Sequence, residues 1–231
     1  MSRHPDQPLC DNARSQPGEP VFNQPRNRRQ ASHDPALVAA ILDAGMVGHF
    51  GFVAGGRPMV IPMAYARGPG CIWLHGGAKA RITRMADNAL LSMTVTLLDG
   101  IVAARSGYHH AMNYRSVVVH GRGRRITEEA ERDAALDAII NHLLPGRSRE
   151  IRAINAQERK ATGVFALDIE AASVKQRAGP PIGDPADDAS GSWAGVIPII
   201  TALGRGLPDA VTAPALPEPP SAKAARQRFA I

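Results

Sequence analysis

The sequence predicts a mainly β domain with peripheral helices, of the α+β class. Short apolar segments alternate with turn-forming residues from Met46 to Ile126, whereas helical periodicity is confined to the two sides of this stretch. The 44% of hydrophobic and 21% of charged residues are typical of globular proteins. One β-rich domain therefore accounts for most of the chain.

The first strands form a predicted antiparallel meander. Segments 46–53, 58–66 and 71–76 are rich in strand-forming residues and are joined by the turn sequences AGGR and RGPG. Pro62 lies inside the second of them. Because proline removes a ladder donor, we expect this segment to be an edge strand or a bulge, with backbone that a ligand can reach.

Further strands follow. Segments 89–98 and 101–106 flank Asp99-Gly100, a dipeptide typical of a tight hairpin turn. Segment 114–126 contains three consecutive valines, which favour extended backbone, so at least six strands are expected by Ile126. Segment 163–176 alternates as a closing strand, with buried positions at Val164, Ala166, Ile169 and Val174.

Three helices are expected around the strands. Asp34, Pro35 and Gly45 are the cap, first-turn residue and stop of a helix over 35–44. Thr127 is the expected cap of a longer helix that ends at Pro145-Gly146, and a polar helix is expected near 148–160.

The termini are expected to lie outside the domain. Residues 1–32 lack apolar periodicity and are predicted to be a mobile arm, and residues 201–231 are rich in proline and alanine and are predicted to be disordered. The β-rich domain is expected at 33–200. Cys10 and Cys71 have no disulfide or zinc spacing, and neither a signal peptide nor a membrane span is apparent, so a cytoplasmic location is expected.

The net charge of +6 is concentrated in the strand-rich part of the chain. Between Ala44 and Thr127 the carboxylates are Asp87 and Asp99, against ten lysines and arginines. This excess favours an anionic ligand on a β scaffold. Nucleic acid is not expected as a partner, because aromatic residues make up 4% of the chain and no reader motif is present.

A first candidate cluster is the segment LHGGAKARITR at 74–84. A strand end passes through Gly76 and Gly77 into a helix-like turn that carries Lys79, Arg81 and Arg84. Glycine backbone, unpaired N–H groups and arginine suit a phosphate. The same pattern also fits a solvated basic helix face, and spacing does not separate the two interpretations.

A second cluster, RSGYHHAMNYRS at 105–116, combines polar, aromatic and basic residues in a loop between strands. It fits either a ligand-binding loop or a turn decorated by His109 and His110. A metal site is not expected, since adjacent histidines point apart on a strand and lack a nearby cysteine or carboxylate at ligand spacing. A single axial haem ligand from His75, His109 or His110 stays open, because it needs no spacing pattern.

These segments resemble the pyridoxamine 5′-phosphate oxidase-related, FMN-binding split-barrel family, in the branch called flavin-nucleotide-binding proteins. The resemblance covers about 26–198 and rests on GRPMVIPMAYAR, WLHGGAKAR, ARSGYHHAMNYRSVVVHGR and SWAGVIP. It implies a six-stranded antiparallel split β-barrel and a homodimer that holds two FMN molecules between its protomers.

The resemblance also implies the roles of individual residues. Lys79 and Arg81, beside His75 and Gly76, are expected to bind the FMN phosphate. The backbone of Val60, Ile61, Pro62 and Met63 is expected to face the isoalloxazine, and Trp193 to cover the site. The cleft is expected to be lined by Ser106, His110, Asn113, Tyr114 and Arg115.

Two departures from the family qualify this expectation. Members of the branch usually carry serines where Gly77 and Ala80 stand here, so two hydroxyl donors to the phosphate are missing. The chain ends in AARQRFAI, without the substrate-binding Arg/His segment of true pyridoxamine phosphate oxidases, so vitamin B6 oxidation is disfavoured.

The expected function is that of an FMN-dependent oxidoreductase of unknown substrate, with NAD(P)H or another small molecule as reductant. No residue is assigned as an acid or base. The alternative is a non-catalytic module that binds or senses flavin or haem, which is favoured by the gathering of histidines and by the lack of an assignable proton-transfer residue.

Overall fold

The computed structural model describes residues 30–230 except positions 86 and 214. The arm expected at 1–32 lies outside this part of the chain apart from its last residues, where Ala31–Ser32 form the short strand β1. The described residues contain no helix with the length and apolar character needed to span a membrane.

The predicted mainly β fold with peripheral helices is confirmed, although the described residues form nine strands rather than six. The order β3-β2-β6-β7-β8-β5-β4 makes one antiparallel sheet, with β1 added to β8 and β9 added to β6. The strands are β2 (Gly48–Ala54), β3 (Arg57–Met63), β4 (Tyr65–Gly68), β5 (Cys71–Gly77), β6 (Leu90–Ala103), β7 (Ala111–Arg125), β8 (Thr162–Arg177) and β9 (Gly195–Pro198).

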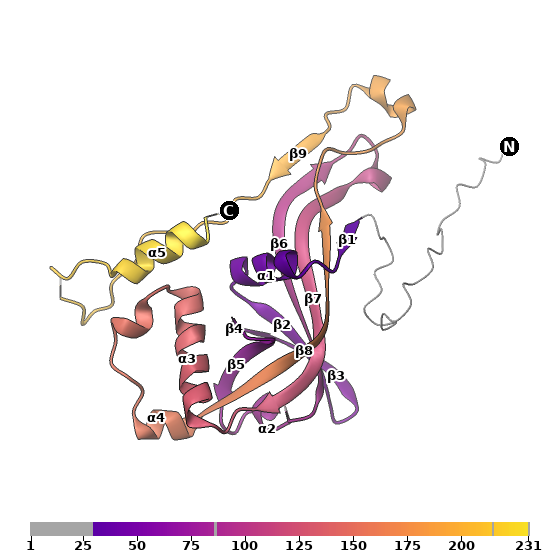
Figure 1. Ribbon diagram of the computed structural model, residues 1–231. Coiled ribbons are helices and arrows are strands. Elements are labelled where there is room, and N and C mark those ends of the chain that lie inside the picture. Colours follow the sequence, from indigo (N-terminus) through magenta and orange to yellow (C-terminus); the bar gives the residue numbers. More distant parts are fainter. Residues whose placement is uncertain (1–29, 86, 214, 231) are drawn as a thin grey trace.

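The two ends of the sheet path meet at Ala64. This residue alone separates β3, which pairs with β2, from β4, which pairs with β5. One bent segment therefore belongs to both ends of the sheet and curls it into a barrel. The β6–β7 pair extends beyond the barrel, with β9 alongside its far half (Figure 1).

The barrel interior is filled by side chains that alternate along the strands. Phe50, Tyr65, Leu74 and Phe165 are fully buried there. Helix α1 (Pro35–Ala44), predicted at these residues, closes the barrel with Ile41 and Leu42 and is capped by the Asp34 carboxylate, which accepts from the Ala36 N–H at 2.9 Å.

A second apolar layer lies under α3 (Glu129–Leu143), which stands beside β4 and β5 in Figure 1. Cys71, Val164 and Ala166 point to this side of the sheet, whereas Ile72 and Phe165 point into the barrel. The predicted buried positions Val164, Ala166 and Val174 are confirmed, and Ile169 is half-buried.

Several predicted boundaries were wrong. Asp99-Gly100 is a bulge within the continuous strand β6, and the chain reverses later, through the 3-10 turn Gly107–His109. Glu128, rather than Thr127, caps α3. The polar helix near 148–160 is replaced by the 3-10 turn Arg147–Arg149 and the short α4 (Ala156–Ala161).

The C-terminal tail, expected to be disordered, contains helix α5 (Pro220–Arg228). Its residues Ser221 and Ala225 and the following Phe229 are each at most 1% exposed. Packing of these side chains against the domain, rather than local sequence pattern, gives this segment its structure.

Candidate functional site

The turn from β5 into α2 (Arg81–Met85) presents cations that have no carboxylate partner. Lys79, Arg81 and Arg84 are exposed, and none of them forms an ion pair with a described residue. Of the seven other arginines of the basic stretch, Arg57 and Arg125 form no ion pair within the described ranges. The remaining five are paired: Arg67 with Asp43, Arg105 with Asp188, Arg115 with Asp99, Arg122 with Glu170, and Arg124 with both Glu131 and Asp168. The net positive charge is therefore available at this turn.

The backbone of the same turn is open. A Cβ placed on Gly77 would have nothing within 4 Å, so a ligand can approach the main chain closely there. The Ala80 N–H donates to the Gly77 carbonyl oxygen at 2.8 Å, which fixes the turn. The buried hydroxyl of Thr83 has no hydrogen-bond partner among the described residues. This donor set fits a phosphate.

His75 and Gly76 lie at the end of β5, immediately before the turn. Desolvation lowers the pKa of His75, although the residue is exposed at the end of the strand. A neutral ring is therefore expected at pH 7, and the positive charge of the turn comes from Lys79 and Arg81.

The β3 segment is an end of the sheet path, as the position of Pro62 predicts. The side chains of Ile61 and Met63 pack against the barrel core, whereas Val60 is 66% exposed and Pro62 faces outward. The side chains of Ile61 and Met63 are thus engaged in core packing, and Val60 and Pro62 form the outward face of this strand.

The predicted residues of the second cluster lie at the far end of the β6–β7 pair. The Ser106 hydroxyl hydrogen-bonds to Nδ1 of His109 at 2.8 Å, and Nδ1 of His110 lies 2.9 Å from the Ser106 carbonyl oxygen. Tyr108, in the same turn, is 87% exposed. These contacts orient the two imidazole rings while Tyr108 projects into solvent.

Asn113 and Arg115 are already engaged by neighbouring strands. The Asn113 amide donates to the Gly179 carbonyl oxygen at 3.1 Å and accepts from Arg177. Arg115 forms a bidentate ion pair with Asp99. Their side chains are thus held in place, and the charge of Arg115 is compensated.

A cavity of about 670 Å³ lies beside these residues, lined by Gln30, Asp99, Arg115, Gln176, Arg177 and Ala178. Gln176 and Arg177 are not among the residues that the sequence predicts for the site. The pairing of Tyr114 with Arg177 and of Arg115 with Gln176 brings them to the same place. Tyr114 is half-buried next to this cavity wall.

An exposed apolar row crosses three strands near the same end. Met112 on β7 pairs with Ile101 on β6, which pairs with Ile197 on β9, and these side chains are 38%, 45% and 51% exposed. Trp193, just before β9, is 66% exposed and its ring lies against Gly195. A solvent-facing apolar row of this kind is typical of an interaction surface.

The two predicted clusters are far apart within one chain. Arg125 donates to the Thr83 carbonyl oxygen at 3.4 Å and so marks the α2 end of β7, whereas Tyr114 lies at the other end. Eleven residues of extended strand span roughly 35 Å. A single chain therefore does not bring the phosphate turn and the second cluster to one ligand.

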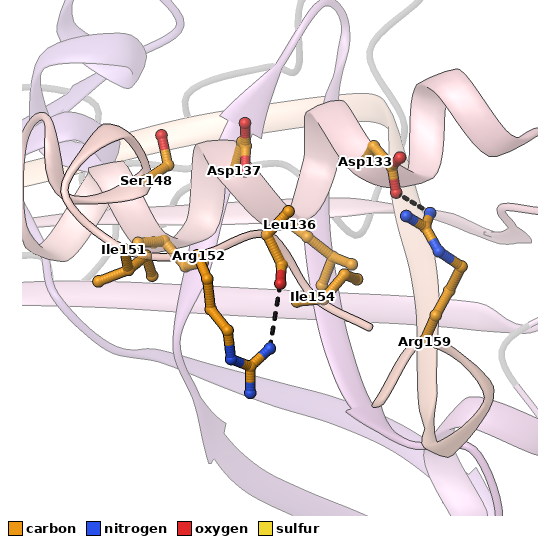
Figure 2. Close-up of a pocket in the computed structure, with 10 residues that line it drawn as sticks. Asp133, Leu136, Asp137, Ser148, Ile151, Arg152, Ile154 and Arg159 are labelled. Atoms are coloured by element: carbon orange, nitrogen blue, oxygen red, sulfur yellow. Dashed lines mark hydrogen bonds and ion pairs between the residues drawn. The ribbon is translucent and has the colours of Figure 1, made fainter. Parts of the chain in front are cut away.

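A separate pocket of about 310 Å³ lies between α3 and residues 148–154 (Figure 2). Its floor is formed by Leu136, Ile151 and Ile154, and the ion pair between Arg159 and Asp133 closes one side. None of the residues predicted to bind a cofactor lines it.

The chain is similar to proteins of known structure over most of its length. It is 37% identical to the flavocytochrome Anf3 from Azotobacter vinelandii, covering 85% of this chain and 92% of that one, with a TM-score of 0.79. It is 32% identical to the FAD and heme binding protein from Mycobacterium smegmatis, covering 85% of this chain and 97% of that one, with a TM-score of 0.81. None of the curated proteins matches the chain.

Residues 34–176 also match the family model described as pyridoxamine 5′-phosphate oxidase. This segment includes α1, all the barrel strands and the turn with Lys79 and Arg81. The family resemblance found in the sequence is confirmed by this match, by the sheet topology and by both solved structures. The chain belongs to the pyridoxamine 5′-phosphate oxidase family of split-barrel proteins.

Proposed function

We propose that the protein is a flavin-binding redox protein that holds the flavin phosphate at the β5–α2 turn. The observation that carries this proposal is the group of exposed, unpaired cations, Lys79 and Arg81, beside the open backbone of Gly77. A phosphate dianion satisfies both features, because arginine and lysine donate to its oxygens and glycine allows close approach. The flavin-binding relatives support the choice of ligand.

FMN is the proposed flavin. The backbone of Val60, Ile61, Pro62 and Met63 on β3 is the proposed surface for the isoalloxazine, since the groups that face away from β2, at Val60 and the Pro62 carbonyl, suit its polar rim. FAD, which the M. smegmatis relative binds, contains the same riboflavin phosphate and therefore also fits the turn. Comparing the Kd values from titrations with FMN and with FAD distinguishes the two ligands.

A homodimer completes the proposed site. The second cluster lies roughly 35 Å from the phosphate turn of its own chain, so Ser106, His110, Asn113 and Tyr114 reach a flavin through a partner protomer. The apolar row of Met112, Ile101 and Ile197 supports such an interface. Trp193 lies at the edge of that row and is proposed to cover the site.

When bound, the flavin supplies hydride or electron transfer. The residues of this chain bind and orient it. Lys79 and Arg81 compensate the phosphate charge, and Arg115, whose side chain is held by its ion pair with Asp99, lines the cleft. Turnover with NAD(P)H and an electron acceptor identifies an oxidoreductase, whereas flavin binding without turnover identifies a carrier or sensor.

The test is the double variant Lys79→Ala/Arg81→Ala. Charge-assisted hydrogen bonds contribute about 1.5–3 kcal/mol each, so the Kd for FMN, measured by quenching of flavin fluorescence, rises at least about tenfold for each lost side chain. The matched control is Arg149→Ala/Lys160→Ala, which removes two exposed cations elsewhere on the surface. Equal affinities of the two double variants would place the phosphate elsewhere.

Haem binding is a second candidate function, favoured by the geometry of His110. The Ser106 carbonyl oxygen can only accept, so Nδ1 of His110 carries the proton and Nε2 keeps its lone pair, as in many metal-ligating histidines. Both similar solved proteins are described as cytochrome or heme-binding. Titration with haem should give a Soret band that His110→Ala abolishes, with His49→Ala as the control.

A further inference from the structure

Helix α5 is docked on the domain by specific contacts. Ser221, at the start of the helix, donates from its N–H and its hydroxyl to the two carboxylate oxygens of Glu150, at 3.0 and 2.6 Å. At the other end, Phe229 is 1% exposed and its ring lies 6.2 Å from that of His142. Arg228 donates to the Asp43 carbonyl oxygen at 2.9 Å. The helix is therefore held at both ends.

His142 of α3 lies under the C-terminal end of α5 and is 5% exposed. Its Nε2 is 2.6 Å from the Gly45 carbonyl oxygen, and its Nδ1 is 3.3 Å from Nη2 of Arg228. A carbonyl oxygen only accepts and a guanidinium only donates. The ring must therefore carry its proton on Nε2 and leave Nδ1 bare, which is the neutral imidazole in one defined tautomer.

The groups around the ring disfavour a second proton. Arg228 faces it from α5, and Arg67 and Tyr65 face it from β4. Asp43 of α1 is the nearby carboxylate, and it is engaged in a bidentate ion pair with Arg67 at 2.7 and 3.0 Å.

Tyr65 adds no negative charge, because burial raises the pKa of its phenol, which donates to the Leu42 and Gly45 carbonyl oxygens. Burial lowers the pKa of His142 below its usual range, and Arg228 and Arg67 add to this effect, while the hydrogen bond to the Gly45 carbonyl oxygen and the charge of Asp43 oppose it.

We propose that His142 is a pH-dependent latch for the C-terminal helix. In the neutral state Nδ1 accepts the hydrogen bond of Arg228 and α5 stays docked. A proton on Nδ1 removes that acceptor and sets an imidazolium against a guanidinium in a buried position. Release of α5 separates the two cations and hydrates the ring.

The direction of the pH effect follows from linkage. In the released state His142 is exposed and titrates near its ordinary pKa of about 6.5. In the docked state the pKa is lower, so the released state binds the proton more tightly. Docking is therefore strongest above about pH 6.5 and weakens up to about tenfold per pH unit below it, until the pH passes the pKa of the docked form.

The latch holds more of the chain than α5 itself. Arg226 of α5 pairs with Glu218 at 2.6 Å, and Glu218 accepts from the Gly206 N–H at 2.8 Å. Gly206 and Glu218 are thus tied to the helix. The chain between β9 and α5 is therefore held at its C-terminal end only while α5 is docked, whereas its N-terminal end is held by the pairing of β9 with β6.

Hydrogen exchange of the full-length protein between pH 5 and 8 tests this proposal. Protection factors, which correct for the pH dependence of intrinsic exchange, are compared for amides of α5 and of β7. We expect α5 protection to fall about tenfold per pH unit below about pH 6.5 while β7 stays protected. Protection of α5 that does not change with pH would overturn the latch.

Two variants and a control sharpen the test. His142→Gln keeps a donor for the Gly45 carbonyl oxygen and stays neutral, so α5 protection should lose its pH dependence, whereas His49→Gln, at an exposed position of β2, should retain it. Arg228→Gln removes the facing cation, and the pKa of His142, followed by NMR, should rise toward its ordinary value. Retained pH dependence in His142→Gln, or an unchanged pKa in Arg228→Gln, would refute the proposal.

Discussion

Arg115 binds both carboxylate oxygens of Asp99 across the β6–β7 pair, with 2.7 Å between Nη2 and Oδ1 and 3.1 Å between Nε and Oδ2. Asp99 stands at the bulge where the register of the two strands shifts between Leu98 and Gly100. The ion pair thus stabilises a bend within a continuous strand. It also distinguishes Arg115 from Lys79 and Arg81, whose charges are not compensated by described residues.

Asp99→Asn is expected to destabilise the protein slightly. The pair is about one-third exposed, and such ion pairs contribute about 0.2–1 kcal/mol to the free energy of unfolding. Urea unfolding should show a loss of this size that shrinks at 1 M salt, because salt screens exposed charges. Asp137→Asn, at an exposed carboxylate without a described ion pair, is the control, and an equal loss there would contradict the assignment.

The strand pattern of the barrel was predictable because burial alternates along its strands, but Asp99-Gly100 was misread. A Cβ on Gly100 would lie 2.9 Å from Val196 and 3.1 Å from the Ile197 carbonyl oxygen. Glycine is needed there because β9 approaches closely, not because the chain turns. A dipeptide pattern cannot indicate that β9, which lies almost a hundred residues later in the sequence, pairs at this position.

Helix α5 was missed for a related reason. Its sequence, PSAKAARQR, has a weak apolar pattern, and its order comes from Phe229 against His142 and from Ser221 against Glu150. Of the candidate site, the gathering of cations in the turn could be read from the sequence, whereas their lack of carboxylate partners could not. Which arginines are paired, and that Gln176 and Arg177 line a cavity with Arg115, depends on strand register, which local patterns do not specify.

Gly121→Ala is expected to destabilise the protein markedly. This glycine lies at the register shift between β7 and β8, and a Cβ on it would stand 1.8 Å from the Asp168 carbonyl oxygen, so backbone must move. Overpacking of this kind costs about 1–3 kcal/mol. Thermal unfolding should detect the loss, while Gly183→Ala, where nothing lies within 4 Å, should change stability by less than about 0.5 kcal/mol.

Gly77→Ser is expected to strengthen FMN binding. The position has open space around an added Cβ, so the hydroxyl supplies a donor at the proposed phosphate site without a clash. One hydrogen bond contributes about 0.5–1.5 kcal/mol, which is about a two- to twelvefold lower Kd. Gly77→Ala adds the Cβ without the hydroxyl, so the ratio of the two Kd values isolates the effect of the hydroxyl from that of the Cβ. If both variants bind FMN equally, the hydroxyl does not meet the phosphate.

Cys71 is expected to be an unreactive thiol whose protonation makes stability depend on pH. It is 4% exposed, and burial, followed by the charge of Asp168, raises its pKa to about 11. At pH 8 the thiolate, which is the reactive form, is therefore scarce. In a Cys10→Ser background, labelling by a disulfide reagent should be at least about a hundredfold slower in the native than in the unfolded protein.

The stability effect has a defined sign. The unfolded state releases the Cys71 proton above about pH 8.5, whereas the folded state keeps it up to about pH 11, so this contribution is complete below pH 8.5 and is lost as the pH rises to 11. The loss is up to about 1.4 kcal/mol per pH unit. Because tyrosines and lysines also titrate in this range, the measurement is the difference in unfolding free energy between Cys71→Ala and the parent protein at each pH. A difference that stays constant from pH 8 to 11 would show that the thiol is not held in its protonated form by the fold.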